Sequence, residues 1–131
     1  MQLEVFCLYH CIIWVEQLRR GIKMPVYNKL VRDNILEIMD AKGVTYRART
    51  LEPIELLTEV KAKMLEEARE FHEATTVQDE VEELVDILEL VYTAICALGV
   101  SYEELEAFRN QKKMERGGFD KGIYLINVED Q

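Results

Sequence analysis

Histidine, cysteine and proline are scarce in this sequence, and their scarcity excludes several kinds of protein. With only two histidines in 131 residues, a histidine-rich metal site is not available. The three cysteines form no CxxC pair and leave an odd count, which predicts reduced thiols in a cytoplasmic protein. Cys7, His10 and Cys11 resemble half of a metal ligand set, but the second half is missing. With two prolines and nearly half its residues hydrophobic, the chain is not a disordered segment.

Basic residues are also too few for a protein that binds nucleic acid. The 16 lysines and arginines are outnumbered by 25 acidic residues, and the formal net charge is -9. Such a chain repels a phosphate backbone, so we expect no nucleic-acid partner. A small phosphorylated ligand remains compatible if a divalent cation bridges the acidic protein and the anion.

The sequence has no apolar run of the roughly 20 residues that cross a bilayer, so we expect no membrane partner. An apolar run from Val5 to Val15 belongs to a leader, residues 1–23, which also lacks the basic start and cleavage site of a secretory signal. The leader is expected to be an extra packing segment or, because Met24 opens a more conventional stretch, to precede the natural start. Residues 24–131 have the length of one domain.

Apolar residues at helical spacing predict four helices and therefore an all-α fold of the four-helix-bundle type. The expected helices cover residues 33–42, 53–75, 76–99 and 101–115. Residues 44–50 are expected to be extended, and residues 123–128 to form a short strand or a tail lying on a partner. Strand content should therefore be minor.

Three local signals support the starts of the later helices. Pro53 fits the first turn of the second helix, and Thr76 is a suitable cap for the third. Ser101 and Glu104 form a capping box for the fourth. The third helix is apolar on nearly all sides, which predicts a position at the centre of a bundle.

Four acidic residues occupy positions that a solvated helix face explains poorly. At about 100° per residue, Glu83 falls among apolar side chains of the third helix, while Asp86 lies between that group and the polar arc. On the second helix, Glu67 borders the apolar stripe and Glu70 lies on the same side. Because an uncompensated buried charge costs several kcal/mol, Glu83 requires a partner, for which a metal ion is a candidate.

Packed antiparallel, the two helices bring these i, i+3 pairs into one acidic pocket. Carboxylate oxygens suit Mg²⁺ or Mn²⁺ and disfavour zinc. The alternative is that all four are ordinary surface acids of amphipathic helices. A need for solubility does not readily explain why two such acidic pairs occur on consecutive helices, because one of these helices is apolar on nearly all sides.

Residues 66–70 and 83–86 resemble the EExxE…ExxD signature of MazG-like nucleotide pyrophosphohydrolases, a superfamily that includes phosphoribosyl-ATP pyrophosphohydrolase. The resemblance extends from Tyr27 to about Leu125 and includes the stretches 29–33 and 112–119. It implies a magnesium site, whose ligands are Glu67, Glu70, Glu83 and Asp86. It also implies a catalytic role for Glu66 and Glu67, in which Glu66 orients or deprotonates the attacking water.

The resemblance further implies that the end of the fourth helix contacts phosphates, through Asn110, Lys112 or Lys113, and Arg116. For the two lysines the alternative is favourable placement near a helix C-terminus, and because they are adjacent, one is expected to do only that. Lys29 and Arg32 have two possible interpretations. They contact a phosphate or ribose of the substrate, or they are solvated charges that precede a helix.

The activity implied by the resemblance is magnesium-dependent hydrolysis of the α–β phosphoanhydride of nucleoside triphosphates, giving a monophosphate and pyrophosphate, in a house-cleaning role. Phosphoribosyl-ATP hydrolysis in histidine biosynthesis uses the same scaffold and stays open. A non-catalytic helical dimerisation or binding module is an alternative of another class, supported by the apolar breadth of the third helix. The same breadth, together with the resemblance, favours a homodimer or a dimer of dimers.

Overall fold

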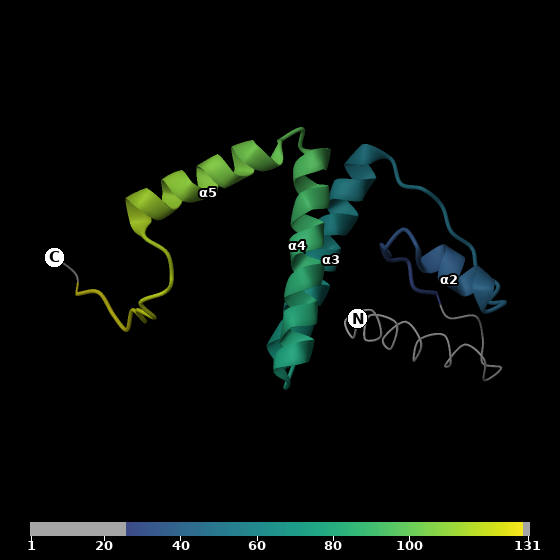
Figure 1. Ribbon diagram of the computed structural model, residues 1–131, viewed down its shortest axis with the longest axis horizontal. Helices are drawn as coiled ribbons and strands as arrows, with labels where there is room; N and C mark the ends of the chain where they lie inside the picture. The colour runs from purple at the N-terminus through teal and green to yellow at the C-terminus, as the bar shows by residue number, and fades with distance from the viewer. Residues whose placement is uncertain (1–25, 130–131) are drawn as a thin grey trace.

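Four helices make up the regular structure of residues 26–129. The computed structural model describes residues 26–129, and these contain no strand. The helices are α2 (Ile35–Ala41), α3 (Pro53–Glu73), α4 (Val77–Ala97) and α5 (Tyr102–Arg116) (Figure 1). The predicted all-α class is confirmed, and each helix end lies within two residues of its expected position. The leader, with Cys7, His10 and Cys11, lies outside the described residues.

Local hydrogen bonds fix where the later helices begin. The Thr76 hydroxyl accepts a bond of 3.1 Å from the Asp79 N–H and so caps α4. At the start of α5, the Ser101 hydroxyl accepts from the Glu104 N–H, while the Glu104 carboxylate accepts from the Ser101 N–H at 2.8 Å. Both predicted caps are confirmed. Gly99, with φ of +71°, lies in the left-handed region just after α4, where a side chain would be strained.

Helices α3 and α4 lie side by side as an antiparallel hairpin (Figure 1). Val60 of α3 is fully buried, and Met39 of α2 and Ile95 of α4 are nearly so. Within residues 26–129 these three are the buried apolar side chains, which makes a small core. Contrary to its expected central position, α4 is covered by α3 along one side and leaves a long apolar stripe exposed. That stripe consists of Val77, Val81, Leu84, Val85, Leu88 and Tyr92.

Helix α5 and the segment after it extend away from the hairpin (Figure 1). The chain bends by 111° between α4 and α5, and no residue of α5 is buried. Residues 123–128 are exposed and irregular, so a strand there is ruled out and the tail interpretation remains. Residues 44–50 also form neither helix nor strand. In the described part of the chain no single helix is long and apolar enough to cross a membrane, and α4 with α5 meets the criteria only as a bent pair.

Candidate metal centre

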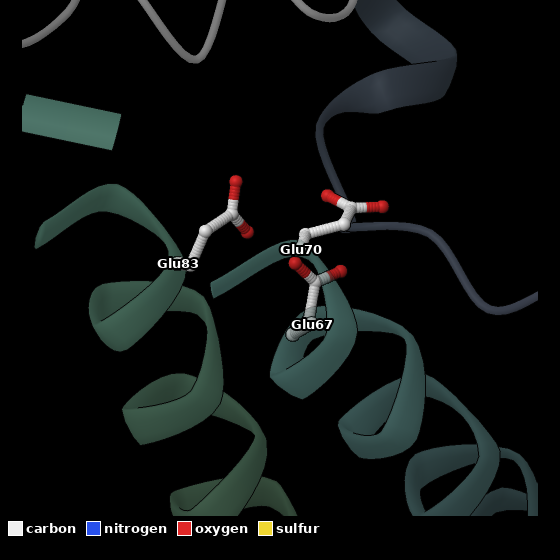
Figure 2. A group of neighbouring side chains, drawn as sticks. All are labelled: Glu67, Glu70 and Glu83. Atoms are coloured by element: carbon white, nitrogen blue, oxygen red, sulfur yellow. The ribbon is translucent and has the colours of Figure 1, made fainter. Parts of the chain in front are cut away.

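Three of the four predicted metal ligands converge between α3 and α4. One carboxylate oxygen from each of Glu67, Glu70 and Glu83 lies within 4.8 Å of the other two. Glu67 and Glu70 come from successive turns of α3, and Glu83 comes from the first half of α4 (Figure 2). The antiparallel packing of the hairpin therefore brings together acids that are 13 or more residues apart in the sequence.

Glu67 and Glu83 are buried, with exposed fractions of 3% and 9%. Oxygen Oε2 of Glu83 has no hydrogen-bond partner among residues 26–129, which is an unfavourable state for a buried polar atom. Burial, a hydrogen bond with Glu67 and the charges of Glu70, Glu67 and Asp86 raise the pKa of Glu83 to about 8. The site therefore concentrates negative charge that only a proton or a cation can neutralise.

Lys63, one turn before the acids on α3, is a site residue that the sequence analysis missed. Its Nζ lies 2.6 Å from Oε1 of Glu67 and 3.0 Å from Oε1 of Glu66. Burial by itself would lower the pKa of Lys63, but the hydrogen bonds to Glu67 and Glu66 outweigh it and raise this pKa. The i, i+3 and i, i+4 spacing of a lysine from two adjacent glutamates was a signal available in the sequence.

Glu66, the neighbour of Glu67 on α3, has two cationic partners. Lys29 Nζ and Lys63 Nζ both lie 3.0 Å from Glu66 Oε1. Partial burial favours a higher pKa for Glu66, but the hydrogen bonds from Lys29 and Lys63 lower it below its usual value. A hollow of about 90 Å³ beside these three side chains has room for water.

Asp86, the fourth predicted ligand, is not in the group of three and is engaged by Arg32. Arg32 donates from Nε to Asp86 Oδ1 at 3.0 Å, and its Nη2 also bonds that oxygen. Asp86 is nevertheless close enough to Glu83 for its charge to raise the pKa of Glu83. The segment before α2 is therefore tied to both helices of the hairpin, through Lys29 to α3 and through Arg32 to α4.

The donor set fits a hard divalent cation. All three convergent ligands are carboxylates, and Glu83 supplies a buried oxygen without a hydrogen-bond partner. Two oxygens bound to one magnesium ion at about 2.1 Å lie no more than about 4.2 Å apart, so the observed spacing needs only small side-chain shifts. No histidine or cysteine joins the group in the described residues, which disfavours zinc.

The predicted phosphate contacts of α5 are not brought to this centre within one chain. Asn110, Lys112, Lys113 and Arg116 are all exposed on the extended helix. Asn110 bonds Arg109 and Glu106 of its own helix. Lys112, Lys113 and Arg116 form no ion pair with any described residue. Lys29 and Arg32, by contrast, contact the acids directly.

A comparison with protein families identifies the family of this chain. Residues 44–113, just over half of the chain, match the model of the phosphoribosyl-ATP pyrophosphohydrolase family. The chain belongs to that family. It is therefore a pyrophosphohydrolase, a hydrolase acting on acid anhydrides, of the MazG-like all-α superfamily. The comparisons with curated proteins and with solved structures gave no match.

The family match covers the acidic centre together with Asn110, Lys112 and Lys113 of α5. Lys29, Arg32 and Arg116 lie outside the matched residues. The convergence of Glu67, Glu70 and Glu83 thus belongs to the shared domain, while the two ion pairs from the segment before α2 are features of this chain that the match does not describe.

Proposed function

We propose that this chain hydrolyses the α–β phosphoanhydride of nucleoside triphosphates with Mg²⁺, releasing a nucleoside monophosphate and pyrophosphate. The observation that carries the proposal is the convergence of Glu67, Glu70 and Glu83, with one buried oxygen of Glu83 left without a hydrogen-bond partner among the described residues. Mn²⁺, which has similar ligand preferences, would be a substitute.

In this proposal the three glutamates hold the cation between α3 and α4. Bound there, Mg²⁺ supplies neutralisation of phosphate charge and activation of the attacking water. Glu83 would bind the cation as the ionised carboxylate, and its raised pKa favours a proton on this carboxyl near neutral pH when no cation is bound. Asp86 would be a fourth ligand if Arg32 released it, and the guanidinium would then be available to a substrate phosphate.

Glu66 is proposed to orient the attacking water rather than to remove its proton. Its pKa lies below the usual glutamate value, so it is a weak base at neutral pH. Its ionised carboxylate nevertheless accepts hydrogen bonds well, and the hollow beside it has room for water. Lys29 and Lys63 keep the carboxylate in place from two sides.

A second candidate substrate is phosphoribosyl-ATP, which the name of the matched family favours. Both candidates contain the same scissile phosphoanhydride, so the acids would act in the same way on either. The two candidates differ in the phosphoribosyl group, for which the proposal assigns no contact to these acids.

Release of pyrophosphate from a panel of canonical, deoxy and damaged nucleoside triphosphates, and from phosphoribosyl-ATP, distinguishes the two candidates. We expect magnesium-dependent turnover of triphosphates. Turnover of phosphoribosyl-ATP alone would select the second candidate. If no nucleotide releases pyrophosphate with Mg²⁺ or Mn²⁺, and Glu67→Gln behaves as the wild type does, the assignment of these acids as an active site is wrong.

A further inference from the structure

The hollow beside Glu66 is formed by two parts of the chain that are distant in sequence. Residues 28–30 line it from the segment before α2, and four residues line it from α3. These four are Glu59, Ala62, Lys63 and Glu66, and their spacings of three, one and three residues place them on one face of the helix. The hollow therefore exists only because the segment before α2 lies against this face of α3.

Lys29 joins the two walls of the hollow. Its Nζ lies 3.0 Å from Oε1 of Glu66, although the two residues are 37 positions apart. Lys63 approaches the same oxygen from within α3, also at 3.0 Å. A side chain on a helix surface can otherwise change its rotamer, but a carboxylate bonded by cations of two different elements is restricted to one orientation. Lys29 thus supplies the restraint on Glu66 that α3 alone does not provide.

The backbone immediately before Lys29 has an unusual conformation. Asn28 has a φ of +44°, and it is the only non-glycine residue with a positive φ among residues 26–129. This left-handed region is unfavourable for most side chains, although asparagine tolerates it better than others. Such conformations persist where the surrounding structure requires them, and they are concentrated at functional sites. The turn at Asn28 sets the direction in which the chain presents Lys29 to α3.

The geometry of phosphoryl transfer determines the side of the substrate on which Lys29 lies. The attacking oxygen and the leaving oxygen are roughly in line through the phosphorus, on opposite sides of it. The proposed function places the attacking water beside Glu66, at the hollow. The leaving pyrophosphate, which carries most of the negative charge of the substrate, then lies on the far side. A lysine beside the hollow is therefore suited to act on Glu66 rather than on a phosphate.

We propose that Lys29 is a positioning residue for the hydrolysis, which holds the Glu66 carboxylate toward the attacking water and does not contact the nucleotide. The inference rests on the proposed function, because it assigns Lys29 a part in the same step. It extends the working active site beyond the matched family domain, since Lys29 precedes residue 44. Lys63 has a different part, because it also bonds Glu67 of the metal centre at 2.6 Å.

Lys29→Met removes the ammonium and keeps an unbranched side chain. We expect kcat to fall by about 10- to 100-fold, the usual effect of losing a group that orients another, while KM changes by less than about two-fold. Lys29→Arg keeps a cation that can donate to Glu66, so it should retain more turnover than Lys29→Met. Lys61→Met, an exposed lysine of α3, is the control and should leave both constants unchanged. If Lys29→Met is folded by thermal unfolding and keeps the wild-type kcat, the proposal is wrong.

A double-mutant cycle separates an effect through Glu66 from a direct effect on the substrate. Glu66→Ala removes the carboxylate on which Lys29 is proposed to act. The double variant Lys29→Met/Glu66→Ala should then have the kcat of Glu66→Ala alone, within about two-fold. Independent effects would multiply instead, and the double variant would be slower than either single variant. That outcome would assign Lys29 a role apart from Glu66 and would contradict the inference.

Binding of a substrate analogue gives a readout that does not depend on turnover. The probe is the α,β-methylene analogue of the triphosphate that the wild type hydrolyses fastest, titrated calorimetrically in the presence of Mg²⁺. We expect wild type and Lys29→Met to bind it equally. Binding weakened by about tenfold or more in Lys29→Met, the effect of losing one charged hydrogen bond, would indicate a phosphate contact and overturn this inference alone. Absence of turnover in the wild type would overturn the proposed function, and the inference with it.

Discussion

The ammonium of Lys63 lies 2.6 Å from Oε1 of the almost fully buried Glu67 and 3.0 Å from Oε1 of Glu66. One cation thus holds two adjacent carboxylates that have different proposed tasks, metal binding for Glu67 and water orientation for Glu66. Because Glu67 is buried, its charge needs this partner whenever no divalent cation is bound.

Replacing Lys63 by methionine keeps most of the length of the unbranched side chain and removes its charge. We expect the metal-free protein to lose about 1–3 kcal/mol of stability, because Glu67 loses its hydrogen-bonded cation. Added Mg²⁺ should then raise the unfolding temperature more than it does in the wild type, which differential scanning fluorimetry measures. Lys61→Met, an exposed neighbour on α3, is the control. Equal magnesium-induced shifts in all three proteins would show that Lys63 does not support the acidic centre.

Glu83→Gln is an isosteric change that removes one proposed metal ligand. We expect turnover to fall by at least about 100-fold, since the loss of a direct ligand should exceed the effect of losing an outer partner. Thermal unfolding should show that the variant is folded and that Mg²⁺ no longer stabilises it. Glu89→Gln, an exposed acid on the same helix, should retain wild-type activity. If Glu83→Gln retains turnover, α4 does not supply the ligand inferred here.

The metal-free protein should lose stability as the pH rises from about 4.5 to about 8. The pKa of Glu83 is raised to about 8 in the folded state, so the folded protein binds a proton that the unfolded chain has already released. The stability that this proton provides is complete below the unfolded pKa and is lost as the pH passes the folded one. The free energy of unfolding, measured in the presence of a chelator at several pH values between 4.5 and 9, checks this pH dependence. Glu83→Gln should remove this pH dependence, and saturating Mg²⁺ should abolish it as well, because the metal-bound carboxylate is ionised in both states.

Arg32→Gln should increase the affinity for Mg²⁺ by a few-fold in the absence of nucleotide. The change releases Asp86 from its ion pair, and the freed carboxylate adds negative charge next to Glu83. Stability should change by less than about 1 kcal/mol, because this ion pair is partly exposed. Isothermal titration with MgCl₂ measures the affinity. An unchanged or weaker affinity would indicate that Asp86 is not part of the ligand set.

Much of the fold could be predicted from the sequence because its signals are local. The caps at Thr76 and Ser101 depend on residues within three positions, and the structure contains both. The i, i+3 spacing of Glu67 and Glu70, with helical geometry for Glu83, was enough to predict their convergence once the two helices were paired. These inferences required only the 3.6-residue period and an antiparallel connection.

Long-range pairings were beyond the reach of the same reasoning. Lys29 meets Glu66 across 37 positions and Arg32 meets Asp86 across 54, and no periodic pattern encodes either contact. The sequence analysis therefore placed Asp86 in the same ligand set as the other acids, whereas the structure pairs it with Arg32. The position of α5 was also not predicted. The chain bends at the turn containing Gly99, and the angle of this bend does not follow from the spacing of apolar residues.

The small core has a consequence for how the protein should behave on dilution. Met39, Val60 and Ile95 are the buried apolar side chains of the described chain, and a 131-residue protein ordinarily needs many more to remain folded alone. If the stripe of α4 supplies the remainder through a second copy, folding and association become one equilibrium. The unfolding temperature should then rise with protein concentration, so that the amount of protein itself determines how much of it is folded.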